Sequence, residues 1–291
     1  MGFTIKELET LSGIKAHTIR IWEQRYQFLK PSRTSTNIRR YSNDELKTLL
    51  NVALLNKYGY KISKIDGMQQ EQRAAELLRL PEEEGRMEHL VNELIGCMVD
   101  LQIEKFEAIL QEHLAEKGVV NTIKMLLFRF LDKTGILWQA GRINPAHEHI
   151  VTNIIRQKLI AAIENLPPAT PAKPTMMLLL PEGQFHELGL LFVNYLLKQK
   201  GLPVIYLGAN VPLKDAEYVA RIKKPEYLYL HLTTLSGKPD FKKFISTLST
   251  NLPECSLLLS GSSTSGSKDV FSSNVTVLES LQDVVAYISR L

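Results

Sequence analysis

The sequence predicts a multidomain chain that joins two all-α regions to one α/β region. Three observations carry this prediction. Short amphipathic stretches around a basic segment fill residues 1–68, and apolar residues spaced three and four apart run through residues 85–165. Beyond a proline-rich stretch, apolar runs alternate with amphipathic stretches over residues 176–291. We therefore expect three domains, of which only the last contains a large sheet.

Composition limits the class of protein. The chain has 291 residues, of which 44% are hydrophobic, and it has no apolar run of the ~18 residues that a membrane helix needs. Its two cysteines, Cys97 and Cys255, lie far apart and give no disulfide or zinc pattern. This usage fits a reduced, cytoplasmic setting, and we expect a cytoplasmic protein with no membrane partner.

Charge is unevenly distributed, although the net charge is only +4. Residues 1–73 carry 13 basic and 7 acidic side chains, whereas residues 74–165 carry 10 basic and 14 acidic ones. A basic N-terminal region beside an acidic one predicts a polyanionic partner for the N-terminal region.

The N-terminal region has the pattern of a helix-turn-helix. Thr4 and Glu7 fit a capping box, Ser12-Gly13 fits a tight turn, and Lys15–Gln24 follows as a second helix. Ile19 and Trp22 are expected to face the core. The outward face carries donors suited to base edges and phosphates in the major groove: Lys15, His17, Thr18 and Arg20.

A wing is predicted directly after this helix. Two short strands around a Ser-Thr-Asn turn account for Leu29–Tyr41, and Asn37 tolerates the positive φ that such a turn needs. Ser42 then caps a third helix, and a fourth begins near Ile62. The wing residues expected at the DNA are Arg33, Asn37, Arg39, Arg40 and Tyr41. Residues 1–68 thus form the predicted DNA-binding domain, and the polar residues 69–84 are interpreted as a linker.

These motifs resemble the MerR-type transcriptional regulators. The resemblance covers residues 3–68 and rests on Thr-Ile-Arg-Ile-Trp-Glu-Gln-Arg-Tyr (18–26), Leu-Lys-Pro-Ser-Arg-Thr (29–34) and Arg-Arg-Tyr-Ser (39–42). The Trp-Glu-x-Arg-Tyr version is similar to the subgroup that represses carotenoid genes. The resemblance implies a repressor that binds a double-stranded DNA operator as a homo-oligomer. Because no sustained heptads follow Gly67, we expect the C-terminal domains to form the dimer or tetramer.

The remaining chain predicts a four-helix bundle over residues 85–165, a proline-rich linker over residues 166–175 and an α/β domain over residues 176–291. In the last domain we expect a doubly wound parallel sheet of flavodoxin-like type, with ligands at the carboxyl ends of its strands. Its expected strands are 176–180, 204–207, 227–232, 256–259 and 275–278, and its expected helices are 185–199, 213–223, 240–252 and 281–291.

A helical bundle followed by such a domain resembles the cobalamin-binding modules of methionine synthase type, which light-sensing MerR-type repressors also carry. Trp138, nine residues and then Glu148-His149 reproduce the bundle motif, in which the Trp covers the upper face of the corrin. Gln184-Phe-His186-Glu-Leu-Gly189 matches Asp-x-His-x-x-Gly, so the resemblance makes His186 the lower ligand of cobalt. The resemblance also implies that the nucleotide tail of the cofactor runs between the loops after the third and fourth strands. The residues expected to contact the tail there are Thr233, Leu235, Gly261 and Ser262.

This chain departs from the cobalamin pattern at several positions. Gln184 replaces the Asp that orients the ligating His and would weaken ligation by ~10–100-fold. Thr233 and Ser262 each add atoms to the tail slot, and Gln139 stands where light sensors often have a second His. The cofactor that the resemblance implies is adenosylcobalamin, with light as one trigger. The alternatives are a regulator whose C-terminal domains bind another ligand or only oligomerise, and a corrinoid carrier, which would leave residues 1–68 unexplained.

Catalysis is not expected. Enzymes that use cobalamin modules need a substrate barrel of ~250 residues, for which the chain has no room. His147 and His149 flank Glu148 but do not share a helix face with each other, and no phosphate-binding glycine loop occurs in the sequence.

Overall fold

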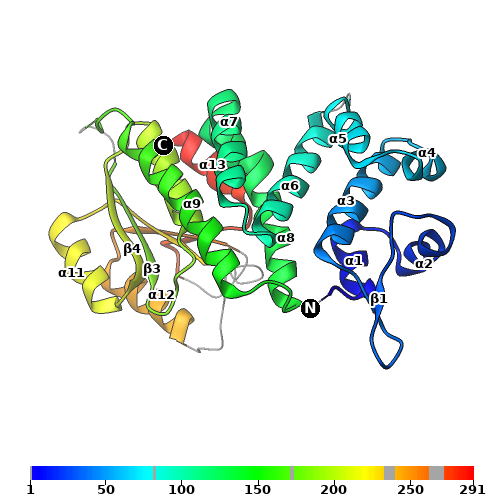
Figure 1. Ribbon diagram of the computed structural model, residues 1–291. Coiled ribbons are helices and arrows are strands. Elements are labelled where there is room, and N and C mark those ends of the chain that lie inside the picture. Colours follow the sequence, from blue (N-terminus) through cyan, green and yellow to red (C-terminus); the bar gives the residue numbers. More distant parts are fainter. Residues whose placement is uncertain (1, 81–82, 171–173, 233–239, 262–271) are drawn as a thin grey trace. The chain divides into compact units, whose positions relative to one another are not determined.

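The computed structural model describes residues 2–80, 83–170, 174–232, 240–261 and 272–291. The chain forms two compact units, Met1–Ile154 and Ile155–Leu291 (Figure 1). The first unit is helical apart from a two-stranded wing, and the second is built around a parallel sheet.

The first unit begins with the predicted helix-turn-helix. Its elements are α1 (Ile5–Ser12), α2 (Ala16–Arg25), β1 (Ser32–Arg33), β2 (Arg39–Arg40), α3 (Asn43–Lys57) and α4 (Ile62–Asp66). Capping boxes at Thr4 and Ser42 satisfy free amides at the starts of α1 and α3, and Gly13 ends α1 with a φ of 73°. Leu8 and Ile19 are fully buried and Trp22 is nearly so, so α1 and α2 share one core.

The stretch interpreted as a linker, residues 69–84, contains a helix. This helix, α5 (Gln70–Leu78), packs against α3 and α6 and buries Leu77 completely. Its nine residues begin with four polar ones and place the apolar Ala74, Ala75, Leu77 and Leu78 together near its end, a pattern too short to distinguish a helix from a linker. The linker interpretation is therefore wrong for this part of the chain.

The bundle follows with α6 (Glu83–Val99), α7 (Ile103–Asn121), the π-helical segment η1 (Thr122–Leu127), α8 (Phe128–Gln139) and α9 (Pro145–Glu164). Gly118 has a φ of 74° and kinks the chain just before η1. The rings of Phe106 and Phe130 meet in the core at 5.4 Å between centroids. Along residues 166–170 and 174–175, the described part of the predicted proline-rich linker, the chain forms neither helix nor strand.

The second unit has the predicted doubly wound sheet. Its strands are β3 (Met176–Pro181), β4 (Val204–Val211), β5 (Tyr227–His231), β6 (Ser256–Ser260) and β7 (Val275–Leu278). All neighbours are parallel and the order is β4-β3-β5-β6-β7, the flavodoxin-like order. The connecting helices are α10 (Leu188–Gln199), α11 (Leu213–Lys223), α12 (Asp240–Asn251) and α13 (Leu281–Arg290).

The sheet is covered on both faces. Apolar side chains of α11 and α12, such as Ala216 and Leu248, pack on the face formed by Met177, Leu230 and Leu257. The carboxyl ends of β3 and β5 meet at the reversal of strand order, which is where ligands bind in such folds. Among the helices that the structure describes, none is long and apolar enough to cross a membrane. Nor do the described residues gather three or more His, Cys, Asp or Glu side chains suited to a metal ion.

Candidate functional site

Helix α2 presents the predicted major-groove residues on its open side. Lys15, at the N-cap, has a side chain that is 83% exposed, and His17 and Arg20 are also exposed, whereas Thr18 is half-buried. Ile19 and Trp22 are buried on the opposite side and fix the helix to the core. The helix therefore offers donors to a partner without loss of core contacts.

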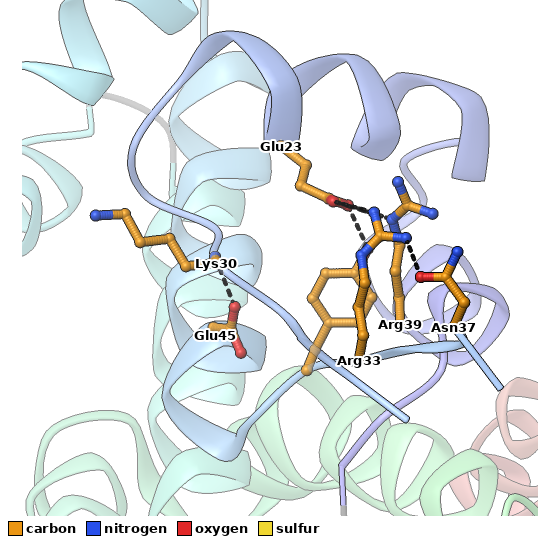
Figure 2. Close-up of polar contacts among 7 residues, drawn as sticks. Glu23, Lys30, Arg33, Asn37, Arg39 and Glu45 are labelled. Carbon is orange, nitrogen blue, oxygen red and sulfur yellow. Dashed lines mark hydrogen bonds and ion pairs between the residues drawn. The ribbon is translucent and has the colours of Figure 1, made fainter. Parts of the chain in front are cut away.

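The wing is held to α2 by Glu23. The Nε of Arg39 donates to both carboxylate oxygens of Glu23, at 3.0 and 2.7 Å, and a guanidinium nitrogen of Arg33 lies 3.8 Å from the same carboxylate. Figure 2 shows Arg33 and Arg39 converging on Glu23 from the two wing strands. The hydrogen bond to Glu23 raises the pKa of the Arg39 guanidinium above its ordinary value.

The turn of the wing follows the prediction for Asn37. Its φ is 63°, and its side-chain oxygen accepts a hydrogen bond of 2.8 Å from Arg33 (Figure 2). Arg33 keeps 44% of its side chain exposed, so it remains accessible to a phosphate. Arg40 is half-buried and donates to the carbonyl oxygen of Gly2 at 3.3 Å.

Tyr41 does not lie where the sequence analysis placed it. Its ring is completely buried, and its hydroxyl donates to Glu23 at 3.1 Å, so it cannot reach a phosphate. Burial raises the pKa of this hydroxyl, with the negative charge of Glu23 acting in the same direction. Tyr41 is thus a core residue that stabilises the carboxylate holding the wing.

Sequence reasoning missed Lys30. Its side chain is exposed at the start of the wing and points away from Glu45, whose carboxylate accepts a 2.7 Å hydrogen bond from the Lys30 backbone amide (Figure 2). The basic residue directly before Pro31 was the available sign. We add Lys30 to the candidate phosphate contacts.

In the bundle, Trp138 is 53% exposed at the end of α8. An exposed indole of this size is not a core residue. Glu148 is half-buried and His149 is exposed, both near the start of α9. The three side chains of the bundle motif are therefore at least partly open to a ligand.

In the second unit, His186 lies exposed on the loop between β3 and α10. Asn210, a residue of β4 with a φ of 59°, fixes this loop by two hydrogen bonds. Its side-chain oxygen accepts from the backbone amide of Gly183 at 2.8 Å, and its backbone amide donates to the backbone carbonyl of Gln184 at 3.0 Å. Glu187 is also fixed, because Tyr206 donates to it at 2.7 Å. Gln184 itself is half-buried. An accessible imidazole on a fixed loop fits a metal-ligating role.

The space beside Gly189 is already filled. A Cβ atom on Gly189 would lie 2.2 Å from Nε2 of His231, a residue at the carboxyl end of β5. Nδ1 of His231 is 2.8 Å from the Ser260 hydroxyl, and burial lowers the pKa of His231 to about 4. Sequence reasoning missed His231, because no motif of the sequence contains it.

Of the residues predicted to contact the nucleotide tail, the structure describes Gly261 alone. Thr233, Leu235 and Ser262 lie outside the described residues. Gly261, with a φ of 108°, is in tight contact with the backbone of Leu232, whose oxygen would lie 2.1 Å from an added Cβ. Within the second unit, the accessible imidazole of His186 fits a ligand to the metal of a corrin, whereas the filled space beside Gly189 does not fit the nucleotide tail.

These features define a class of protein: a DNA-binding regulator with a ligand-binding module attached. Residues 3–72 match the MerR HTH family regulatory proteins, and residues 90–162 match the B12 binding domain. The chain is thus similar to MerR-type transcriptional regulators in its N-terminal region and to B12-binding domains in the region that follows.

Two relatives extend the match over most of the chain. The HTH-type transcriptional repressor CarA of Myxococcus xanthus is 28% identical over 243 residues, 83% of this chain and 80% of the relative. CarH, a second HTH-type transcriptional repressor of the same organism, is 25% identical over 84% of this chain and 83% of its own. The monomethylamine corrinoid protein of Methanosarcina barkeri shares the fold, with a TM-score of 0.55 at 15% identity over 69% of this chain and 98% of its own.

Proposed function

We propose that this chain represses transcription by placing α2 in the major groove of an operator and the wing along the phosphate backbone. The observation that carries this proposal is the single-sided layout of α2, in which donors face outward while Ile19 and Trp22 anchor the helix. Lys15, His17, Thr18 and Arg20 are the proposed groove contacts, and Lys30, Arg33 and Arg40 the proposed backbone contacts. Self-association into a dimer or tetramer supplies a second half-site.

The DNA half of the proposal is tested by salt dependence. A duplex selected by the protein from a random pool is titrated at several salt concentrations, with the wild type and with Lys15→Ala/Arg20→Ala. The variant is expected to bind about tenfold more weakly or worse, with a salt slope smaller by ~2 if both side chains contact phosphates. The matched control is Lys214→Ala/Lys223→Ala, which removes the same charge from exposed positions on α11. A flat salt response, or equal losses in both variants, contradicts the assignment of α2.

We further propose that the C-terminal module holds a corrinoid, with His186 as the residue that binds its metal and Trp138 as the residue that covers its ring. Their exposure and the fixed loop around His186 support this role. Adenosylcobalamin is the proposed form, because its cobalt–carbon bond is light-sensitive and supplies a trigger. The protein residues bind, orient and shield the ligand, and its presence alters self-association and operator binding.

An absorbance titration tests this second half. The wild type and His186→Ala are titrated in the dark with adenosylcobalamin and with cobinamide, the corrin ring without its nucleotide tail, and then illuminated. Binding that weakens in His186→Ala, with a spectral change on ligation, supports the proposal. Sedimentation of the same samples reports self-association. If neither corrinoid binds, the module acts only in assembly.

A further inference from the structure

Three polar side chains meet at the carboxyl ends of β5 and β6. His231 is the last residue of β5 and pairs in register with Ser260, the last residue of β6. Nδ1 of His231 is 2.8 Å from the Ser260 hydroxyl and 3.4 Å from the hydroxyl of Tyr229, which also bonds Ser260. The imidazole is therefore held in one orientation by two neighbouring strands.

The opposite edge of the imidazole lies against the start of α10. An ideal Cβ on Gly189 would be 2.2 Å from Nε2 and 2.3 Å from Cδ2 of His231, so the ring occupies the volume that any side chain at position 189 would need. Gly189 allows this approach because it has no Cβ. His231 thus fills the gap between the first turn of α10 and the strand ends.

The adjoining loops are also in close contact. The Leu232 amide donates to the Ser260 carbonyl at 2.7 Å, and Gly261 approaches the Leu232 backbone so closely that a Cβ there would collide with it. At their described ends, Leu232 and Gly261, the chain segments after β5 and β6 are therefore in direct contact. This is the place that the resemblance assigns to the nucleotide tail of cobalamin.

We propose that His231 is a plug: its imidazole closes the slot in which the nucleotide tail of cobalamin would lie. The module therefore prefers to bind a corrinoid ring whose nucleotide tail is absent or not inserted. This inference rests on the proposed corrinoid function and deepens it. The bonds to Ser260 and Tyr229 keep the plug in place, and the neutral state of His231, whose pKa burial lowers to about 4, avoids a buried charge.

The test compares two corrinoids that differ in the tail, hydroxocobalamin and cobinamide, by absorbance titration of the full chain. The wild type is expected to bind cobinamide at least about tenfold more tightly than hydroxocobalamin. His231→Ser removes the ring and is expected to reduce or reverse this preference. His231→Asn, which can still bond to Ser260, guards against a folding defect, and circular dichroism checks the fold of each variant. Tyr218→Ser, which removes an exposed ring from α11, is the control and is expected to behave as the wild type.

Each outcome is decisive. Equal binding of both corrinoids by the wild type, unchanged in His231→Ser, would overturn the plug and leave the corrinoid function standing. Hydroxocobalamin binding that appears only in the His231 variants supports the plug. If neither corrinoid binds to the wild type or to either His231 variant, both the corrinoid function and the plug are overturned.

Discussion

The Nε of Arg39 donates to both carboxylate oxygens of Glu23 and so ties strand β2 of the wing to helix α2. Glu23 belongs to the Trp-Glu-x-Arg-Tyr motif, and its side chain is only 13% exposed. Since the hydroxyl of the buried Tyr41 donates to the same carboxylate, a single acidic residue sets the geometry between the groove-binding helix and the wing.

Loss of this carboxylate should weaken both stability and DNA binding. Glu23→Gln removes the charge and leaves Arg39 and Tyr41 with poorer partners, which should cost ~1–3 kcal/mol of unfolding free energy. Chemical denaturation and operator titration measure the two effects. Glu9→Gln, which removes the exposed pair with Lys15, is the control and should change stability by less than ~1 kcal/mol. Equal effects of the two substitutions would contradict the role given to Glu23.

The wing turn should discriminate between side chains at position 37. Asn37 has a φ of 63°, so Asn37→Gly should preserve stability, whereas the β-branched Asn37→Val should cost ~1–2 kcal/mol. Ser35→Val serves as the control, because the backbone of Ser35 is not left-handed. Thermal unfolding and operator affinity are the measurements. A harmless Asn37→Val would show that the turn is not under this constraint.

Gly189 and His231 should be strongly coupled. Gly189→Ala places a methyl group on the His231 ring and should destabilise the second unit by ~1–3 kcal/mol. The double variant Gly189→Ala/His231→Ser should recover much of this loss, because the ring is gone. Gly135→Ala is the matched control: it lies in α8 with nothing within 4 Å of the added atom and should be neutral or stabilising. Additive effects in a double-mutant cycle would disprove the contact.

Stability should also depend on pH through His231. Burial lowers the pKa of its imidazole to about 4, below the ~6.5 of an unfolded chain. Between these values the unfolded chain takes up a proton that the folded chain does not, so unfolding free energy falls as the pH drops from about 6.5 to about 4. One proton gives at most ~1.4 kcal/mol per pH unit, and partial exposure reduces this. Denaturation of His231→Asn at about pH 7 and pH 5 should show a smaller fall than the wild type.

The two neighbours Leu137 and Trp138 should separate stability from ligand binding. Leu137 is fully buried, so Leu137→Ala should cost ~2–5 kcal/mol of unfolding free energy. Trp138 is 53% exposed, so Trp138→Leu should leave stability nearly unchanged while weakening corrinoid binding. Thermal unfolding and the absorbance titration measure these effects. A large loss of stability in Trp138→Leu would show that Trp138 stabilises the fold instead of covering a ligand.

Much of the fold could be predicted because the hydrophobic pattern is strong. Helix α11 and strand β7 match their predicted bounds, and the other elements of the α/β domain differ by one to four residues at one end. Strand β4 continues to Val211, four residues beyond the prediction, through a left-handed Gly208 that a hydrophobic pattern does not reveal. Helix α10 begins at Leu188 rather than Phe185, because Asn210 holds the preceding loop in a non-helical conformation.

The site could be predicted only as far as motifs reach. The open face of α2 follows from the spacing of Ile19 and Trp22, and the exposure of His186 follows from its place after a strand. Tyr41 and His231 could not be placed in this way, since their roles come from contacts with Glu23 and Gly189, distant in sequence. The register in which strands pair, and the contacts between side chains that are distant in sequence, are properties of the folded chain.

The DNA-binding domain and the bundle share one packed unit, which affects how chimeric repressors should be made. Lys57 bonds Glu88 at 2.8 Å, Lys47 bonds Asp100 at 2.6 Å, and Gly85 lies directly against Tyr58, so α3 and the bundle are joined by specific contacts. A cut near residue 69 would split this interface and expose its apolar side. A domain swap that moves the DNA specificity to another sensor should therefore transfer the bundle as well, with the fusion point between residues 166 and 175.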